Sequence, residues 1–270
     1  MFSIRVDHMI VAVLDRDVAA QDYNALGFKT IVGGTHPDGH THNCLVPLAQ
    51  GPYIELVSPT DVREIRVRHE DHNLHWLYCF NAGEGFAGYA LGVPDIDPVV
   101  DRLKEKDYAL NGPRRGGRVL PDGTQTLSNS INIVNPRYPA IGADITPREW
   151  RIPITPENST HDNGVTGVAH IIAMVHNLED GVQRYEALTG IEAEHGTSIS
   201  GARTADFQVA NARLTIAEPT DPNTTMYEDL TLRGEVPFLI RLRTTDKSKV
   251  GLLDRILTHH ARFELIYDGA

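Results

Sequence analysis

The sequence predicts an α+β protein of tandem βαβββ units, and two observations support this fold class. Residues 4–57 contain a β-branched stretch, a helical pattern and three further strand patterns, in that order. The same order starts again near residues 89, 167 and 237, and two openings resemble each other: Val6-Asp7-His8-Met9-Ile10 and Val168-Ala169-His170-Ile171-Ile172. Because internal repeats decide the architecture, we expect two halves with two units each.

The first unit begins with the clearest patterns in the chain. Residues 4–13 are rich in β-branched side chains and predict a strand. Residues 18–26 carry apolar residues at helical spacing and stop at Gly27, so they predict a helix. Three more strands are expected at 28–32, 42–48 and 53–57, with a Gln50-Gly51 turn between the last two.

The later units repeat this order, and the last one is short by about two strands. For the second unit we expect strands at 89–93, 124–127, 130–134 and 140–145 and a helix at 98–106. For the third and fourth we expect strands at 167–175, 207–209, 213–217, 237–243 and 262–267, and helices at 181–188 and 249–258. Residues 148–167 have the composition of a linker. We therefore expect one domain over 1–150, which holds the site, and a second over 164–270.

Composition excludes several classes of protein. The chain has 270 residues, of which 41% are hydrophobic and 23% charged, as in ordinary globular proteins. Its net charge of -11 argues against nucleic-acid binding, which needs a positive field. The apolar runs are too short to span a membrane, and two cysteines cannot form a disulfide framework. The start lacks the pattern of a leader. We expect a cytoplasmic monomer or homodimer with a small-molecule substrate and no membrane partner.

Several motifs resemble those of the vicinal oxygen chelate superfamily, which includes glyoxalase I, bleomycin resistance proteins and extradiol dioxygenases. They are residues 6–13, 33–37, 51–57, 93–97 and 118–123. More narrowly, the chain is similar to glyoxalase-like domain proteins. The resemblance implies that the βαβββ units pair into cup-shaped open barrels and that a divalent metal ion sits in such a cup.

His8 on the first strand and Glu55 on the fourth match metal-ligand positions of that superfamily. A neutral imidazole with a carboxylate suits Zn, Mn, Ni or Fe, and the sequence does not choose among them. The alternative is a buried pair with a structural role only. The second unit departs from the superfamily pattern, since Ala87 or Gly88 stands where a histidine is expected. Its last strand offers Gly142, Ala143 or Asp144 where a carboxylate is expected.

Histidines near the first hairpin are candidates for the missing ligand. If the hairpin turn has two central residues, His42 shares the side of Glu55 and would bind metal or act as general base. If the loop has three residues, Asn43 shares that side instead. His36 is a candidate substrate contact in the preceding loop. His69, His72 and His75 are interpreted as surface residues.

Two other positions complete the candidate set. Arg118 lies in a stretch that resembles the family's Arg-x-x-Pro-Asp-Gly pattern and would hold a substrate oxyanion, or else pair with Asp122 across a turn. His170 matches His8 in the third unit, but the position matching Glu55 falls near Thr215. We therefore interpret His170 as a structural residue.

These features favour a glyoxalase-like, metal-dependent lyase or isomerase, with His42 and Glu55 catalytic and with His8, His42 and Glu55 as metal ligands. His36, Asn43 and Arg118 would bind a small carbonyl or hydroxy-carbonyl substrate, which reacts through a metal-stabilised enolate. The alternative is a binding or sequestering protein of the same fold that holds no metal. The residues missing from the second unit support that alternative.

Overall fold

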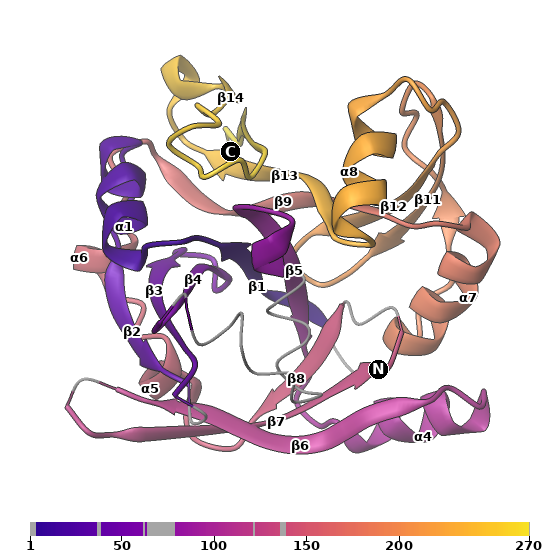
Figure 1. Ribbon diagram of the computed structural model, residues 1–270, viewed down its shortest axis with the longest axis horizontal. Helices are drawn as coiled ribbons and strands as arrows, with labels where there is room; N and C mark the ends of the chain where they lie inside the picture. The colour runs from indigo at the N-terminus through magenta and orange to yellow at the C-terminus, as the bar shows by residue number, and fades with distance from the viewer. Residues whose placement is uncertain are drawn as a thin grey trace.

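The computed structural model of the protein describes residues 4–36, 39–61, 63, 79–120, 122–135 and 139–269. Its strands form two sheets, a closed eight-stranded barrel and an open seven-stranded sheet (Figure 1). Most of the barrel strands lie in the lower half of Figure 1, and the second sheet with its helices lies above them. The paired βαβββ units expected from the sequence are therefore confirmed.

The barrel is made from the first half of the chain. Its strands follow the order β1-β4-β3-β2-β6-β7-β8-β5, so each βαβββ unit contributes four neighbouring strands. The ring closes where β2 meets β6 at Thr35 and Val119, whereas the sequence suggested an open cup. The bounds are β1 Arg5–Ala12, β2 Ile31–Thr35, β3 Thr41–Pro47, β4 Tyr53–Pro59, β5 Gly85–Gly92, β6 Leu110–Val119, β7 Gln125–Ile133 and β8 Ala140–Asp144.

The second sheet comes from the rest of the chain and does not close. Its order is β10-β11-β12-β9-β13-β15-β14, and its two edge strands, β10 and β14, have two residues each. The last unit contributes three strands, β13, β14 and β15, where the sequence predicted two. The bounds are β9 Val165–Met174, β10 Glu194–His195, β11 Ala202–Gln208, β12 Arg213–Pro219, β13 Pro237–Thr244, β14 Gly251–Leu252 and β15 Phe263–Tyr267.

Helices cover the outer faces of both sheets. The Asp15 side chain caps the first helix by accepting hydrogen bonds from the backbone N–H groups of Asp17 and Val18. Helix α4 contacts α7 of the second half. No helix in the described ranges is long and apolar enough to cross a membrane. The bounds are α1 Arg16–Ala25, α4 Asp97–Glu105, α5 Arg148–Arg151, α6 Pro156–Ser159, α7 Leu178–Thr189, α8 Thr225–Arg233 and the 3-10 helix η1 Lys247–Lys249.

Two predictions for segments that contain glycine were wrong. Strand β2 continues through Gly33 and Gly34, where a strand end was expected. Glycine is required at position 33 because a side chain there would overlap that of Asn43. The expected helix over 249–258 is wrong. Gly251 has a φ of 134°, which no helix allows, and it pairs with Leu265 as part of β14.

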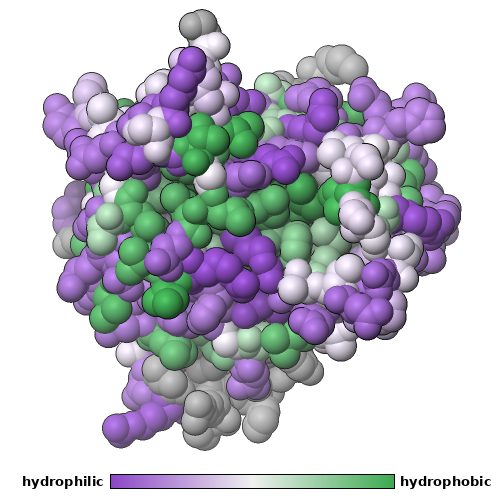
Figure 2. Space-filling model, turned by 90° about the horizontal axis from the view of Figure 1, so that it is seen from above, coloured by the Kyte–Doolittle hydropathy of each residue, from purple (hydrophilic) through white to green (hydrophobic). Residues whose placement is uncertain are grey.

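One hydrophobic cluster joins the two sheets, with Met9, Leu56, Phe207 and Phe263 among its buried members. The upper face, shown in Figure 2, exposes part of its hydrophobic side chains to solvent. Hydrophobic side chains form a band across it, next to a hydrophilic group. Leu252 and Ile256 of the C-terminal region are 71% and 78% exposed. The apolar residues of the C-terminal half therefore lie partly in the shared core and partly on the exposed surface.

Candidate functional site

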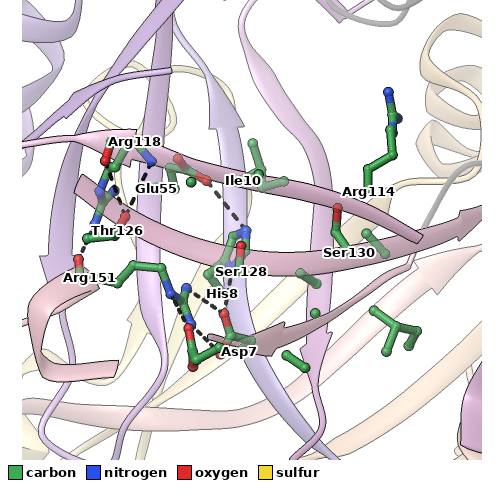
Figure 3. A pocket seen from close by; sticks show the side chains of 18 of the residues that line it. Asp7, His8, Ile10, Glu55, Arg114, Arg118, Thr126, Ser128, Ser130 and Arg151 are labelled. Carbon is green, nitrogen blue, oxygen red and sulfur yellow. Dashed lines mark hydrogen bonds and ion pairs between the residues drawn. The ribbon is translucent and has the colours of Figure 1, made fainter. Parts of the chain in front are cut away.

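A cavity of about 260 Å³ lies inside the closed barrel. The first unit contributes ionisable and aromatic side chains to its wall, and the second contributes mainly small and polar ones (Figure 3). The main lining residues are Asp7, His8, Ile10, His36, Tyr53, Glu55, Ala90, Arg114, Gly116, Arg118, Thr126, Ser128, Ser130, Asn132, Ala140, Gly142, Asp144 and Arg151. Gly142 and Ala143, two of the positions where a carboxylate ligand was sought, line the cavity with side chains too small to bind an ion.

His8 and Glu55 meet in this cavity, as their positions on neighbouring parallel strands predicted. Strand β1 pairs with β4 so that Ile10 lies opposite Glu55, and His8 and Glu55 reach the same face. Their closest atoms, Nε2 of His8 and Oε2 of Glu55, are 3.5 Å apart. The imidazole also stacks on the Tyr53 ring, with a centroid distance of 4.8 Å. Packing thus fixes the ring that faces the carboxylate.

A β-bulge brings Asp7 beside His8. Val6 pairs with Leu91 and His8 with Ala90, so Asp7 is the extra residue in β1. Both Asp7 and His8 consequently line the cavity, and Asp7 Oδ2 lies 2.8 Å from His8 Nδ1. A carboxylate on one ring nitrogen fixes the tautomer and leaves the other nitrogen available as an electron-pair donor. Here that nitrogen is Nε2, which faces Glu55.

The surroundings of Glu55 keep its carboxylate ionised. Glu55 is only 7% exposed, and burial by itself would raise its pKa. The His36 contact, the proximity of His8 and the charge of Arg118 outweigh this effect and hold the pKa at about 2. Asn43 Nδ2 donates a hydrogen bond to Oε1. The site therefore contains a buried anion at neutral pH, with Oε1 occupied by a donor and Oε2 facing His8.

The hairpin register decides between the histidines. Leu45 pairs with Glu55, so Asn43 shares its side, and this is the second of the two alternatives left open by the sequence. His42 pairs with Ser58 and lies on the opposite face of β3, where Arg16 and Asp17 influence it electrostatically. The expectation that His42 lies beside Glu55 is therefore wrong, because a shift of one residue reverses the face.

His36 takes the place that His42 was expected to fill. Its Nε2 lies 3.6 Å from Oε1 of Glu55, and its Nδ1 lies 2.7 Å from the Thr41 hydroxyl. His36 follows β2 directly, so the end of that strand positions it at the cavity. Two imidazoles thus flank one carboxylate, each held at Nδ1 by another side chain.

Arg118 is buried in the wall near Glu55, as expected for a residue of the site. Its guanidinium donates to Asn43 Oδ1 at 3.4 Å and to the Arg151 carbonyl, and its Nε has no hydrogen-bond partner in the described part of the chain. Asp122 instead accepts from the backbone N–H of Thr124. Buried polar groups normally have partners, so an unpartnered one needs an explanation.

Two arginines of α5 pair with the carboxylates at one end of the site, and neither was predicted from the sequence. Arg151 donates to Asp7 and Asp144 at 2.7–3.2 Å and to the Tyr53 hydroxyl at 2.7 Å. Arg148 also donates to Asp7. Burial would raise the pKa of Asp7, but its hydrogen bond to His8 and the charges of Arg151 and Arg148 hold it well below its usual range. Asp144 lines the cavity, but its carboxylate pairs with Arg148 and Arg151.

A polar wall on β6 and β7 was also missed. Thr126, Ser128, Ser130 and Asn132 alternate along β7 and all line the cavity, whereas Ile131 and Ile133 are buried in the hydrophobic core. This alternation of polar and other residues is visible in the sequence and is the signal that could have found the wall. The expected break between residues 127 and 130 concealed it.

The second half places different chemistry at the matching positions. His170 Nε2 lies 2.6 Å from the Thr215 hydroxyl, which donates to Asp206. Burial, followed by the charge of Arg241, lowers the pKa of His170 to about 4. These contacts support the interpretation of His170 as structural.

The donors of the barrel suit a metal ion, although the site is not a complete ligand set. No group of three or more His, Cys, Asp or Glu side chains in the described residues is arranged to hold an ion. His69, His72 and His75 lie outside the described residues. Two ligands about 2.1 Å from a tetrahedral ion lie about 3.4 Å apart, close to the 3.5 Å between His8 Nε2 and Glu55 Oε2.

Two solved structures that match most of this chain support its fold. The crystal structure of a hypothetical protein from Staphylococcus aureus matches with a TM-score of 0.74 and 14% identity, over 97% of this chain and 100% of that one. A mutant of 4-hydroxymandelate synthase from Streptomyces coelicolor matches with a TM-score of 0.60 and 12% identity, over 94% and 77%. Methylmalonyl-CoA epimerase from the same organism matches with a TM-score of 0.34 and 22% identity, over 39% and 96%.

Comparison with known sequences supplies the family. No curated protein matches the chain. The family described as Glyoxalase-like domain matches residues 6–172, which is more than half of the chain and includes every strand of the barrel. The chain therefore belongs to the glyoxalase-like domain family, and its fold is that of the vicinal oxygen chelate superfamily.

Proposed function

We propose that this chain is a metal-dependent enzyme of the lyase or isomerase type that moves a proton on a small carbonyl or hydroxy-carbonyl compound. The observation that carries the proposal is the meeting of His8 and Glu55 in a cavity, with His36 on the other side of the same carboxylate. When bound, the metal ion supplies Lewis-acid stabilisation of the charge that develops on the substrate oxygen.

His8 and Glu55 are the residues that would hold the ion. Asp7 keeps the Nε2 electron pair of His8 directed toward Glu55, and the low pKa of Glu55 keeps its carboxylate available as a ligand. The Asn43 donor covers Oε1, so Oε2 is the oxygen that suits a cation. With only these two protein ligands, a bound ion would still be open to oxygens of the substrate.

His36 is the residue that we assign to proton transfer, in place of His42. It lies on the Oε1 side of Glu55, away from the edge shared by Oε2 and His8, and its Nδ1 is tied to Thr41. An imidazole is the side chain most often used for this step. Arg118 donates near Glu55 and suits an oxyanion of the substrate.

The second candidate is a metal-free binding protein of the same fold. Its support is that the side chains of His8, His36 and Asn43 surround the Glu55 carboxylate and already satisfy it. Such a protein would use the cavity to hold an organic ligand and would need no general base.

Metal analysis and thermal shift separate the two candidates. We expect Mn²⁺, Zn²⁺, Ni²⁺ or Fe²⁺ to raise the melting temperature of the wild type, and we expect this shift to disappear in His8→Ala and Glu55→Gln. His170→Ala is the matched control and should keep the shift, because its Nε2 bonds to Thr215. Less than a tenth of an equivalent of metal per natively purified chain, with no loss in His8→Ala, would contradict the enzyme.

A further inference from the structure

We propose that the substrate carries an anionic group, a carboxylate or a phosphate, at the end remote from its reacting oxygens, and that Arg114 and Ser130 hold this group. The inference rests on the proposed function for the reacting end alone. Anion binding at the remote end can be measured whether or not the chain is an enzyme.

The register of β6 and β7 arranges the remote end of the cavity. Three cross-strand pairs face the cavity in succession, namely Arg118 with Thr126, Gly116 with Ser128, and Arg114 with Ser130. Residues four apart on a strand lie about 13 Å apart, so an arginine stands at each end of this wall. Figure 3 shows Arg118 and Glu55 at one end and Arg114 and Ser130 at the other.

Gly116 leaves the space between the two arginines open. A Cβ atom at this position would meet nothing within 4 Å, although the residue lines the cavity. A ligand that occupies this gap would reach from the His8 and Glu55 end toward Arg114. Neighbouring Ser128 and Asn132 add polar groups along its path.

The charges of the lining are unevenly placed along the cavity. The described lining has three arginines and three carboxylates, Arg114, Arg118 and Arg151 with Asp7, Glu55 and Asp144. Asp7 and Asp144 both pair with Arg151. Along β7 and β8, Ser130 lies opposite Gly142 and Ser128 opposite Asp144, so the strand positions next to Arg114 carry no carboxylate.

The polar wall also favours hydrogen-bonding oxygens over an apolar tail. Hydroxyl and amide groups that a ligand covers must find new partners, since burying them unpaired costs free energy. Carboxylate and phosphate oxygens accept from both a guanidinium and a serine hydroxyl. The Arg114 and Ser130 pair supplies these two donors from directly opposite positions.

The test compares probes that differ only at the remote end. Titration calorimetry with Mn²⁺ present would measure 2-oxoglutarate, its distal amide 2-oxoglutaramate, and 2-oxo-4-phosphonobutanoate. We expect at least one charged probe to bind at least tenfold more tightly than the amide, and the better of the two identifies carboxylate or phosphate as the preferred group.

Variants assign the preference to the remote end. Arg114→Gln should reduce the ratio between charged probe and amide to within twofold, whereas Arg115→Gln should leave it unchanged. Arg115 is the matched control, because it follows Arg114 on the strand and its side chain faces the opposite side. Gly116→Leu should weaken every probe at least tenfold at an unchanged melting temperature, since it fills open space.

Three results would overturn the inference: equal binding of amide and charged probes, a ratio that survives Arg114→Gln, or no binding of any probe. The proposed function fails separately, through the metal measurements on His8→Ala. A chain that binds no metal but still prefers charged probes would keep the inference and lose the enzyme.

Discussion

The barrel and the second sheet use the same strand positions in opposite ways. Glu55 lies opposite Ile10 in the barrel, and Thr215 lies opposite Ile172 in the second sheet. Ala90, which pairs with His8, corresponds to Arg241, which pairs with His170. An anionic carboxylate and open space in one half are thus replaced by a hydroxyl and a large side chain in the other.

A second ion pair completes the contrast. Arg241 pairs with Glu264 on β15, and Arg241 Nε lies 2.6 Å from Glu264 Oε2. The matching residues of the barrel are Ala90 and Ala140, which line the cavity. The second sheet therefore fills with its own side chains the place that the barrel keeps open. The comparison shows that the cavity depends on small residues in the second unit of a pair, at the positions where the fourth unit has the Arg241–Glu264 ion pair.

The largest expected effect separates the buried ion cluster of the barrel from an exposed one in the second half. Arg151→Ala should lower the free energy of unfolding by about 3–5 kcal/mol, because it leaves the buried Asp7 and the half-buried Asp144 without their main cation. Urea denaturation would measure this loss.

The control for this prediction is Arg203→Ala. Arg203 pairs with Glu179 and Glu218 at the surface, where solvent screens the charges and such pairs add little stability, so we expect a much smaller loss. Equal losses in the two variants would show that burial does not distinguish the two clusters.

The next prediction concerns a variant in which the barrel cavity receives the ion pair of the second sheet. Ala90→Arg combined with Ala140→Glu places in the barrel the pair that occupies the second sheet, and should weaken metal and 2-oxoglutarate binding at least 100-fold, about 2.7 kcal/mol. The chain should still fold, because the new charges can pair as Arg241 and Glu264 do. Calorimetry and far-UV circular dichroism would check both points.

The reverse exchange tests whether space alone makes a site. Arg241→Ala combined with Glu264→Ala opens the second sheet but leaves Thr215 where the barrel has Glu55. We expect no additional metal binding. A second equivalent of metal in this variant would contradict the requirement for the carboxylate.

The sequence predicted the parts of the site that depend on local order. His8 and Glu55 could be placed because a strand, a helix and a hairpin follow one another within 57 residues, and parallel pairing of β1 with β4 then brings them together. The repeat also identified His170 as the counterpart of His8. The order of strands and helices needed only period-two and helical patterns, which survive errors of one or two residues at element ends. The choice of His8 and Glu55 as ligands rested on the resemblance to the vicinal oxygen chelate superfamily.

The rest of the site depends on single-residue choices and distant pairings. One additional residue in the hairpin loop places Asn43, and not His42, on the side of Glu55. The bulge that turns Asp7 into the cavity has no sequence signature, and Arg151 reaches Asp7 from 144 positions away. Strand β6, which was not predicted, contains Gly112-Pro113 and Gly116-Gly117, and a register shift between Asn111 and Arg114 absorbs the first pair.

A pH series should sharpen the contrast at the histidine of the second half. His170 is buried and takes up a proton only near pH 4, whereas an unfolded histidine does so near pH 6.5. Between these values the unfolded chain binds more protons, so stability is lost as pH falls from 6.5 to 4, by about 3 kcal/mol from this residue. Denaturation of the wild type and of His170→Asn at pH 4–7 would isolate it, and parallel curves would refute this assignment.

The smallest expected effect concerns the contact that joins the two halves. The hydroxyl oxygens of Tyr89 on β5 and Tyr185 on α7 lie 2.6 Å apart, and both rings are buried in the shared core. Tyr89→Phe should cost about 1–2 kcal/mol of unfolding free energy, because the Tyr185 hydroxyl then remains buried without a partner. The double variant with Tyr185→Phe should cost less than the sum of the single losses, with a coupling of about 1 kcal/mol. Purely additive losses would mean that the two halves share apolar packing there but no effective hydrogen bond.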